Sequence, residues 1–219
     1  MVSILDIICI YIYILLALKF NIAITHRNYK IYIKYLYPEN NTDIYNTFNN
    51  KLILDIGCGN NIIHSESLIH YLLYNTNCIV YGVDLYKLDN NFLTSIYQWF
   101  YPINYNLTYL NHYINADASS LPFLKNSVDI IFSYWLLGTW IQKEWDLLKI
   151  FYEFHRVLKK NGEIRIYPIY SLNKYNNSFL KNFINCNFSY KEVYVKPGLM
   201  ECVSNCVIPA HTWILTKLS

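Results

Sequence analysis

Leu52-Ile-Leu-Asp-Ile-Gly-Cys-Gly-Asn-Asn61 is the stretch that decides the fold of this 219-residue chain. Residues 51–56 form a short, almost wholly apolar run, which is typical of a buried parallel strand. Gly57 and Gly59 follow, and glycine lets backbone approach a ligand without a Cβ in the way. Apolar residues then resume at helical spacing, namely Ile62, Ile63, Leu68, Ile69, Leu72 and Leu73. The order strand, glycine turn, helix predicts a turn at the carboxyl end of a strand, where open α/β sheets bind ligands.

A glycine turn of this kind serves two classes of ligand. A dinucleotide site favours a small residue three positions after the second glycine, for close helix packing and a pyrophosphate at the helix N-terminus. Here that position is Ile62, which fits poorly. Asp55 lies two residues before Gly57, and its negative charge would repel a pyrophosphate but suits a cationic or hydroxyl-bearing ligand. Both residues therefore argue against a nicotinamide-dependent oxidoreductase, which stays as an alternative.

Asp55-Ile-Gly-Cys-Gly59 resembles the first motif of the class I S-adenosylmethionine-dependent methyltransferases. The family often has a third glycine soon after it, where this chain has Asn60 and Asn61. Asn tolerates positive φ better than other non-glycine residues, so we expect the turn to form. The resemblance implies an α/β fold, a three-layer sandwich around a seven-stranded, mostly parallel sheet of order 3-2-1-4-5-7-6. It also implies S-adenosyl-L-methionine as the cofactor and methyl transfer as the activity.

The pattern of strands and helices from residue 51 onward indicates a parallel sheet with right-handed crossovers. The expected strands are 51–56, 78–85, 107–116, 128–133 and 163–167, with a closing antiparallel pair at 188–195 and 207–216. The expected helices after the one that follows the glycine turn are 88–100, 141–158 and 176–184. We divide the chain into an apolar N-terminal segment with a lead-in helix at 1–48 and a methyltransferase domain at 49–219.

Asp84 ends the apolar run at 79–83, at the tip of the second expected strand. An acid in that place can accept both hydroxyls of a ribose. A helix N-cap or a loop acid is the alternative role for Asp84, and Leu85 beside it joins the expected cofactor site. The resemblance gives the methionine portion of the cofactor to the first motif, through Asp55, Gly57, Cys58 and Gly59.

Asn115-Ala-Asp-Ala118 closes the third strand and resembles the family's adenine-binding segment. There an Asp takes the exocyclic amine and the next backbone N–H reaches a ring nitrogen, roles that fall on Asp117 and Ala118. The alternative for Asp117 is an N-cap of a short helix after it. Residues 127–135 resemble the family's fourth motif, in which the strand end, Ser133, is expected to face the methyl group.

The residues after Ser133 argue against two classes of methyl acceptor. DNA and protein-glutamine N-methyltransferases carry an acidic or amide residue, two prolines and an aromatic residue here, and this chain does not. An aromatic face near a sulfonium gains cation–π attraction, so Tyr134, Trp135 and Trp140 are candidates for a pocket wall, with core packing as the alternative. A base is needed only if the acceptor must lose a proton. The candidates by placement near strand ends are Tyr134, His112 and His64.

Residues 151–166 resemble the family's connection between a helix and the fifth strand, with Lys160 and Asn161 in place of a proline and a glycine. This segment is structural in the family, so His155 and Arg156 are expected to be scaffold residues. The matches together run from Leu52 to Pro168, in the order that the family requires.

Composition excludes several other classes. The chain is 54% hydrophobic and 18% aromatic, with 23 tyrosines and a net charge of +3. No basic run exceeds two residues, so a nucleic-acid footprint is not evident. The six cysteines are scattered, which favours free thiols in a reducing cytosol over a disulfide framework. A zinc site at Cys202 and Cys206, with His211 and Cys186, lacks a matching second half, so we expect no metal.

The N-terminal stretch Val2–Ile24 allows two interpretations. Its apolar core, Ile7–Leu18, is about half of the ~20 residues that span a bilayer, and it lacks the flanks of a secretory signal. It is either a helix that packs on the domain or contacts a membrane surface, or a short signal anchor. For a signal anchor, the basic residues after it would keep the remainder cytoplasmic, and we expect the domain in the cytosol in both cases.

These residues support a cytoplasmic methyltransferase with a small-molecule acceptor. The alternative is a catalytically inactive relative, a binding or scaffold protein in which Asn60 and Asn61 weaken the cofactor site.

Overall fold

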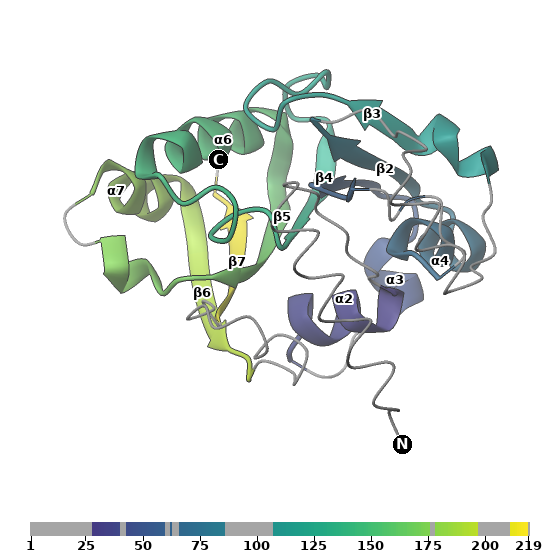
Figure 1. The fold of residues 1–219 in the computed structure, drawn as a ribbon, viewed down its shortest axis with the longest axis horizontal. Helices are drawn as coiled ribbons and strands as arrows, with labels where there is room; N and C mark the ends of the chain where they lie inside the picture. The colour runs from purple at the N-terminus through teal and green to yellow at the C-terminus, as the bar shows by residue number, and fades with distance from the viewer. Residues whose placement is uncertain are drawn as a thin grey trace, which may run out of the picture.

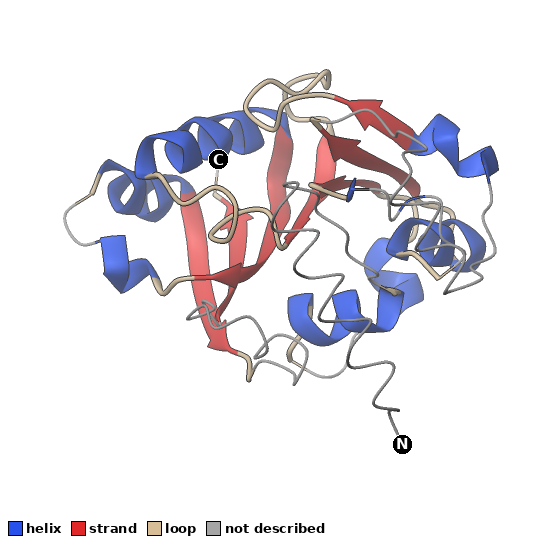
Figure 2. Cartoon of the chain, in the orientation of Figure 1, coloured by secondary structure: helices blue, strands red, loops and turns tan. Residues whose placement is uncertain are grey.

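A seven-stranded sheet crosses the centre of the molecule, with helices on both of its faces (Figure 1, Figure 2). The computed structural model describes residues 28–39, 43–59, 62, 66–85, 107–175, 178–196 and 211–218. The strand order is β3-β2-β1-β4-β5-β7-β6, with β1 to β5 parallel and β7 antiparallel to both of its neighbours. The predicted fold class and strand order are therefore confirmed.

The described elements have the following bounds. The strands are β1 Leu52–Ile56, β2 Ile79–Asp84, β3 Tyr113–Asn115, β4 Val128–Tyr134, β5 Leu158–Ile169, β6 Phe188–Tyr194 and β7 His211–Lys217. The helices are α2 Tyr29–Leu36, α3 Ile44–Phe48, α4 Leu68–Asn75, α6 Glu144–Val157 and α7 Phe179–Asn187, with 3₁₀ helices η2 Leu107–His112 and η3 Leu172–Tyr175.

The third strand differs most from its predicted length. Residues 107–112 form the 3₁₀ helix η2, and only β3 pairs with β2. The Nδ1 atom of His112 lies 2.9 Å from the carbonyl oxygen of Val80, so a side chain contacts the β2 backbone just before pairing begins. β3 is the edge of the sheet, where short strands are common. The prediction of a strand over 107–116 is wrong for its first half.

Element boundaries shift around β5 and α7. α6 begins at Glu144 rather than at 141, and β5 follows it at once from Leu158. Asn161 adopts φ 61°, a left-handed conformation that Asn tolerates. A Cβ on Gly162 would lie 2.9 Å from the carbonyl oxygen of Asp129, so only glycine fits there. α7 begins at residue 179 instead of 176, with Ser178 as its N-cap.

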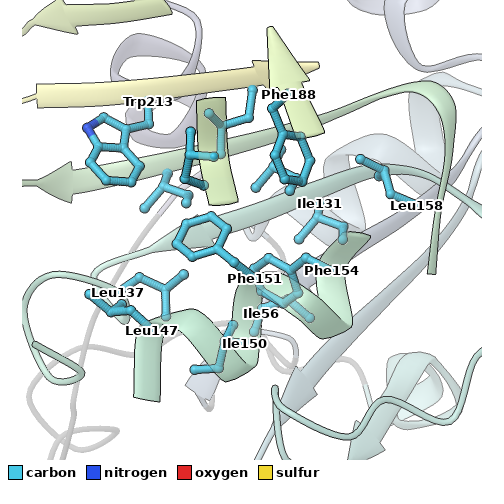
Figure 3. Packing of buried hydrophobic residues seen from close by; sticks show 14 of the residues in the cluster. Ile56, Ile131, Leu137, Leu147, Ile150, Phe151, Phe154, Leu158, Phe188 and Trp213 are labelled. Carbon is cyan, nitrogen blue, oxygen red and sulfur yellow. The ribbon is translucent and has the colours of Figure 1, made fainter. Parts of the chain in front are cut away.

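Side chains alternate between the two faces of the sheet and form two cores. On the face covered by α6 and α7, Phe151 and Phe154 pack against Ile131 and Trp213 (Figure 3). The opposite face, covered by α2 and α4, is rich in buried tyrosines: Tyr32, Tyr35, Tyr37, Tyr134 and Tyr167. Each fully buried large apolar side chain contributes roughly 1.5–3 kcal/mol relative to an exposed one.

The C-terminal end of the lead-in helix α2 is hydrogen-bonded to strands β5 and β7. The hydroxyl of Thr212 on β7 donates to the carbonyl oxygen of Tyr35 at 2.6 Å. The Nη1 atom of Arg165 on β5 donates to the carbonyl oxygen of Leu36 at 2.8 Å. The last carbonyls of a helix lack partners within it, and a cation there also complements the helix dipole. Two strands therefore fix the C-terminal end of α2.

Within the described ranges, no helix is long and apolar enough to cross a membrane. The predicted helix at 88–100, the stretch Val2–Ile24 and the cysteine pair at 202 and 206 lie outside the described residues.

Candidate functional site

The glycine turn after β1 lies where the carboxyl ends of β1, β2 and β4 meet. Gly57 adopts φ 76° and Gly59 φ 56°, left-handed conformations that favour glycine. The N–H of Gly57 donates to the carbonyl oxygen of Val83 at 2.8 Å, which ties the turn to β2. A Cβ on Gly57 would lie 2.7 Å from the Cβ of Leu136. The first glycine is therefore required by the fold itself, because the loop after β4 packs directly on it.

Asp84 lies at the tip of β2 and joins the turn. Its Oδ2 atom accepts a hydrogen bond from the N–H of Gly59 at 2.8 Å. This bond from the backbone of the turn orients the Asp84 carboxylate, a group with about four acceptor positions. Leu85 beside it is 58% exposed. The side-chain amide of Asn115 donates to the carbonyl oxygen of Leu85 at 2.8 Å, which holds the tips of β2 and β3 together.

Cys58 points beneath the turn. The residue is buried, and a Cβ on Gly82 would lie 2.7 Å from its sulfur, so the thiol fills the space over β2. Tyr113 of β3 is a close neighbour. Burial, together with the nearby Cys58 and Asp84, raises the pKa of Tyr113, so its phenol stays neutral at physiological pH.

Asp55, on β1, is 2% exposed and faces α2. Its Oδ2 atom accepts a hydrogen bond from the hydroxyl of Tyr32 at 3.0 Å. The ring of Tyr32 lies 4.9 Å from that of Tyr134, which also packs on Tyr35 and Tyr167. The lead-in helix thus reaches the first acid of the motif, a contact between residues 23 positions apart that the sequence pattern did not identify.

The aromatic residues after Ser133 do not assemble into one wall. Tyr134 is buried among the tyrosines under α2, whereas Trp140 is 52% exposed. Trp135 is half-buried and adopts φ 66°, and its N–H donates to the carbonyl oxygen of Tyr167 at 2.7 Å. Positive φ on a tryptophan costs on the order of 1–2 kcal/mol, and such strain gathers at functional sites. No sequence signal marked Trp135 as strained.

Ser133 lies opposite Ile56 of β1, level with the end of that strand. It is fully buried, and its hydroxyl has no hydrogen-bond partner among the described residues. Its position at the carboxyl edge is the one expected from the fourth motif.

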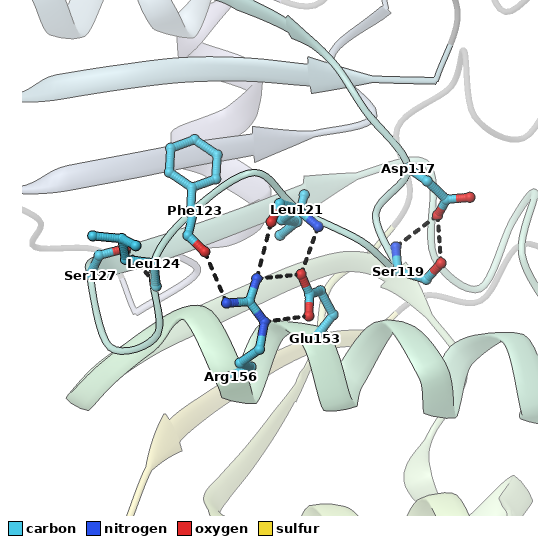
Figure 4. Close-up of polar contacts among 8 residues, drawn as sticks. All are labelled: Asp117, Ser119, Leu121, Phe123, Leu124, Ser127, Glu153 and Arg156. Carbon is cyan, nitrogen blue, oxygen red and sulfur yellow. Dashed lines mark hydrogen bonds and ion pairs between the residues drawn. The ribbon is translucent and has the colours of Figure 1, made fainter.

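Asp117 caps the turn after β3 (Figure 4). Its Oδ1 atom accepts hydrogen bonds from the N–H and the hydroxyl of Ser119, at 2.7 and 2.8 Å, while the second oxygen points away from this turn. Residues 118–127 contain turns and bends and no helix, so the alternative of a helix N-cap is wrong. Ala118 follows Asp117 in the turn, half-buried.

Backbone groups of Leu121 and Phe123, farther along this loop, are hydrogen-bonded to an ion pair on α6, Arg156 with Glu153 (Figure 4). The guanidinium of Arg156 donates to the carbonyl oxygens of Phe123 and Leu121, at 2.9 and 3.0 Å. Glu153 accepts from Arg156 and, at 2.6 Å, from the N–H of Leu121. The hydrogen bond from Arg156 lowers the pKa of Glu153. Arg156 thus acts as a scaffold residue, as expected.

The three candidate bases lie in different places. His112 precedes β3 and contacts the carbonyl oxygen of Val80, which lies four positions before Asp84 at the β2 tip. The structure therefore does not bring His112 to the glycine turn. Tyr134 lies in the aromatic core under α2. His64 is outside the described residues.

Comparison with known proteins agrees with this geometry. A family model described as a methyltransferase domain matches residues 54–166. A search of curated protein sequences found no match.

Several solved structures are similar to this chain at low sequence identity. A protein from Pyrococcus horikoshii is 17% identical with a TM-score of 0.52, covering 87% of this chain and 91% of the other. A SAM-dependent methyltransferase from Methanosarcina mazei is 16% identical with a TM-score of 0.48, over 78% and 93%. A phosphoethanolamine N-methyltransferase from Haemonchus contortus, bound to phosphomonomethylethanolamine and S-adenosylhomocysteine, is 14% identical with a TM-score of 0.50. That match covers 85% of this chain and 52% of the other.

Proposed function

This chain belongs to the class I S-adenosylmethionine-dependent methyltransferases, and we propose that it methylates a small-molecule acceptor. The observation that carries the proposal is the hydrogen bond between the N–H of Gly59 and Asp84, at 2.8 Å. It brings the glycine turn and the ribose-binding acid together at adjacent strand ends, as a nucleoside with an amino-acid tail requires.

The proposed contacts follow the strand ends in order. Asp84, with Leu85 beside it, binds the ribose, and Asp117 with Ala118 binds the adenine. Ser133 lies nearest the methyl group. The methionine portion is held by Asp55, Gly57, Cys58 and Gly59.

The residues present fit this cofactor. The left-handed glycines expose the backbone of the turn, and the N–H of Gly59 orients the Asp84 carboxylate, a group that can accept hydrogen bonds from hydroxyl donors. When bound, S-adenosyl-L-methionine supplies an electrophilic methyl group on a sulfonium. The task left to the chain is to align acceptor and cofactor, which can supply much of the acceleration of an in-line displacement.

The net charge of the chain and the residues at the carboxyl end of β4 support a small-molecule acceptor. The net charge of +3, without a basic run longer than two residues, gives no footprint for nucleic acid. The half-buried Trp135 next to Ser133 offers an apolar contact on the acceptor side.

Calorimetric titration with S-adenosylhomocysteine tests the proposal. We expect micromolar binding by the unaltered protein and about a 100-fold weaker affinity for Asp84→Ala, because hydrogen bonds to a charged group are lost. Asp146→Ala, which removes an exposed acid on α6, is the matched control and should bind normally. If the unaltered protein does not bind, the methyltransferase proposal fails and a binding or scaffold role is favoured.

A further inference from the structure

Asp55 is the acid of the first motif, and its orientation depends on a residue outside that motif. The hydroxyl of Tyr32 donates to Oδ2 of Asp55 at 3.0 Å, and both residues are almost completely buried. A hydrogen bond to an ionised carboxylate is stronger than one between neutral groups. Rotation of the carboxylate about its χ2 torsion would break this bond, so Tyr32 fixes the plane of the two oxygens.

The helix that carries Tyr32 is held at both ends. At its N-terminal end the ring of Tyr29 stacks on Tyr71 of α4 with a centroid separation of 3.7 Å, and the N–H of Tyr29 donates to the carbonyl oxygen of Glu66. At its C-terminal end Thr212 and Arg165 bind the last carbonyls. α4 follows the glycine turn in the chain, while Arg165 and Thr212 belong to β5 and β7. Tyr32 therefore cannot shift toward or away from Asp55 without disturbing these anchors.

Packing against a neighbouring aromatic ring also restricts the ring of Tyr32. It lies 4.9 Å from the ring of Tyr134, at the end of β4, and is 1% exposed. The packed ring therefore has little room to move while its hydroxyl binds Asp55.

We infer that Tyr32 is a positioning residue of the cofactor site, which holds the Asp55 carboxylate in the orientation that receives the methionine end of S-adenosyl-L-methionine. This inference rests on the proposed function. The methionine end carries an ammonium group, and a buried carboxylate of fixed orientation attracts it without a cost of reorganisation. Loss of the Tyr32 hydroxyl removes a contact that orients the carboxylate, so affinity falls while the carboxylate itself remains.

The test compares two tyrosine-to-phenylalanine variants on the same helix. Tyr32→Phe removes the hydroxyl and keeps the ring in place. Tyr35→Phe is the matched control, because Tyr35 is also buried but its hydroxyl accepts from Lys34 at 3.4 Å. Each variant is titrated with S-adenosylhomocysteine and with 5′-methylthioadenosine, which keeps the nucleoside and the thioether but lacks the amino-acid end.

We expect Tyr32→Phe to weaken S-adenosylhomocysteine binding about tenfold and to change 5′-methylthioadenosine binding less than about twofold. Tyr35→Phe should change neither. Normal binding of 5′-methylthioadenosine also shows that the variant is folded.

Three results would overturn the inference. If Tyr32→Phe binds S-adenosylhomocysteine as the unaltered protein does, Tyr32 does not act through Asp55. If it loses both ligands equally, Tyr32 has only a structural role. If the unaltered protein binds no S-adenosylhomocysteine, the proposed function fails and the inference with it.

Discussion

Two carboxylates near the carboxyl ends of β1 and β2 have different hydrogen-bond partners from two carboxylates on β4 and α6. Asp55 and Asp84 accept hydrogen bonds from neutral donors, the Tyr32 hydroxyl and the Gly59 amide. Asp129 and Glu153 instead pair with cations, Lys159 and Arg156. A neutral donor orients a carboxylate without cancelling its charge, whereas a cation turns it into part of the scaffold. We propose that the first region serves the cofactor, whereas the ion pairs of the second region stabilise the fold.

This difference predicts whether a substitution lowers cofactor affinity or the stability of the fold. Changes at the first region should lower cofactor affinity and leave the fold intact. Changes to the ion-paired region should lower stability and leave affinity nearly unchanged.

The largest loss of stability is expected at Arg165. Its side chain is 8% exposed, binds the Leu36 carbonyl, pairs with Glu39 and Glu163, and lies 3.7 Å from the ring centre of Tyr37. Arg165→Met leaves these groups without their partner, and we expect the free energy of unfolding to fall by about 3 kcal/mol in urea denaturation.

Lys159→Met is the control for removing a cation, since Lys159 pairs with Asp129 at a more exposed site. It should cost less than about 1 kcal/mol. Equal losses for the two variants would contradict the role of Arg165 as the anchor of α2.

A smaller loss is expected at Glu153. Glu153→Gln removes the charge that holds Arg156 and weakens the attachment of the 121–123 loop to α6. We expect about 1–2 kcal/mol less stability by denaturation, with S-adenosylhomocysteine affinity within about twofold of normal. Asp146→Asn, an exposed change on the same helix, should have no effect. A large loss of affinity in Glu153→Gln would show that the two regions are not separable.

We also expect Glu153 to make the stability of the protein depend on pH. Arg156 lowers the pKa of Glu153 in the folded state. A carboxyl group with a lowered pKa contributes stability above its unfolded pKa and loses it as the pH falls through its folded pKa. Thermal unfolding midpoints should therefore fall in acid more steeply for the unaltered protein than for Glu153→Gln. Parallel curves would mean that Glu153 is not stabilised by its ion pair.

The smallest effect is expected at Ser133, in comparison with Thr212. The buried hydroxyl of Ser133 has no partner among the described residues, so Ser133→Ala should change the unfolding midpoint by less than about 2 °C. Thr212→Val removes the donor to the Tyr35 carbonyl and should cost about 1–2 kcal/mol. A large loss in Ser133→Ala would mean that its hydroxyl already stabilises the fold.

The sequence predicted those features that follow directly from strand ends. The glycine turn, Asp55 and Asp84 were found from short apolar runs bounded by glycine or acid, whereas the strand order came from the family resemblance alone. The division of the chain after residue 48 stays a prediction.

Contacts between distant segments could not be predicted in this way. Tyr32 meets Asp55 because α4, β5 and β7 together hold α2 in place, and no local sequence pattern indicates those contacts. The left-handed φ of Trp135 likewise depends on the neighbouring β5 carbonyl. The third strand was overestimated because hydrophobic spacing does not show that an edge strand has a single neighbour.

A crystal structure of the protein with S-adenosylhomocysteine would test the central claim most directly. We expect the ribose hydroxyls within hydrogen-bond distance of the Asp84 carboxylate, and the amino-acid end over the glycine turn toward Asp55. A ligand bound elsewhere, or bound at this edge with its ribose away from Asp84, would contradict it.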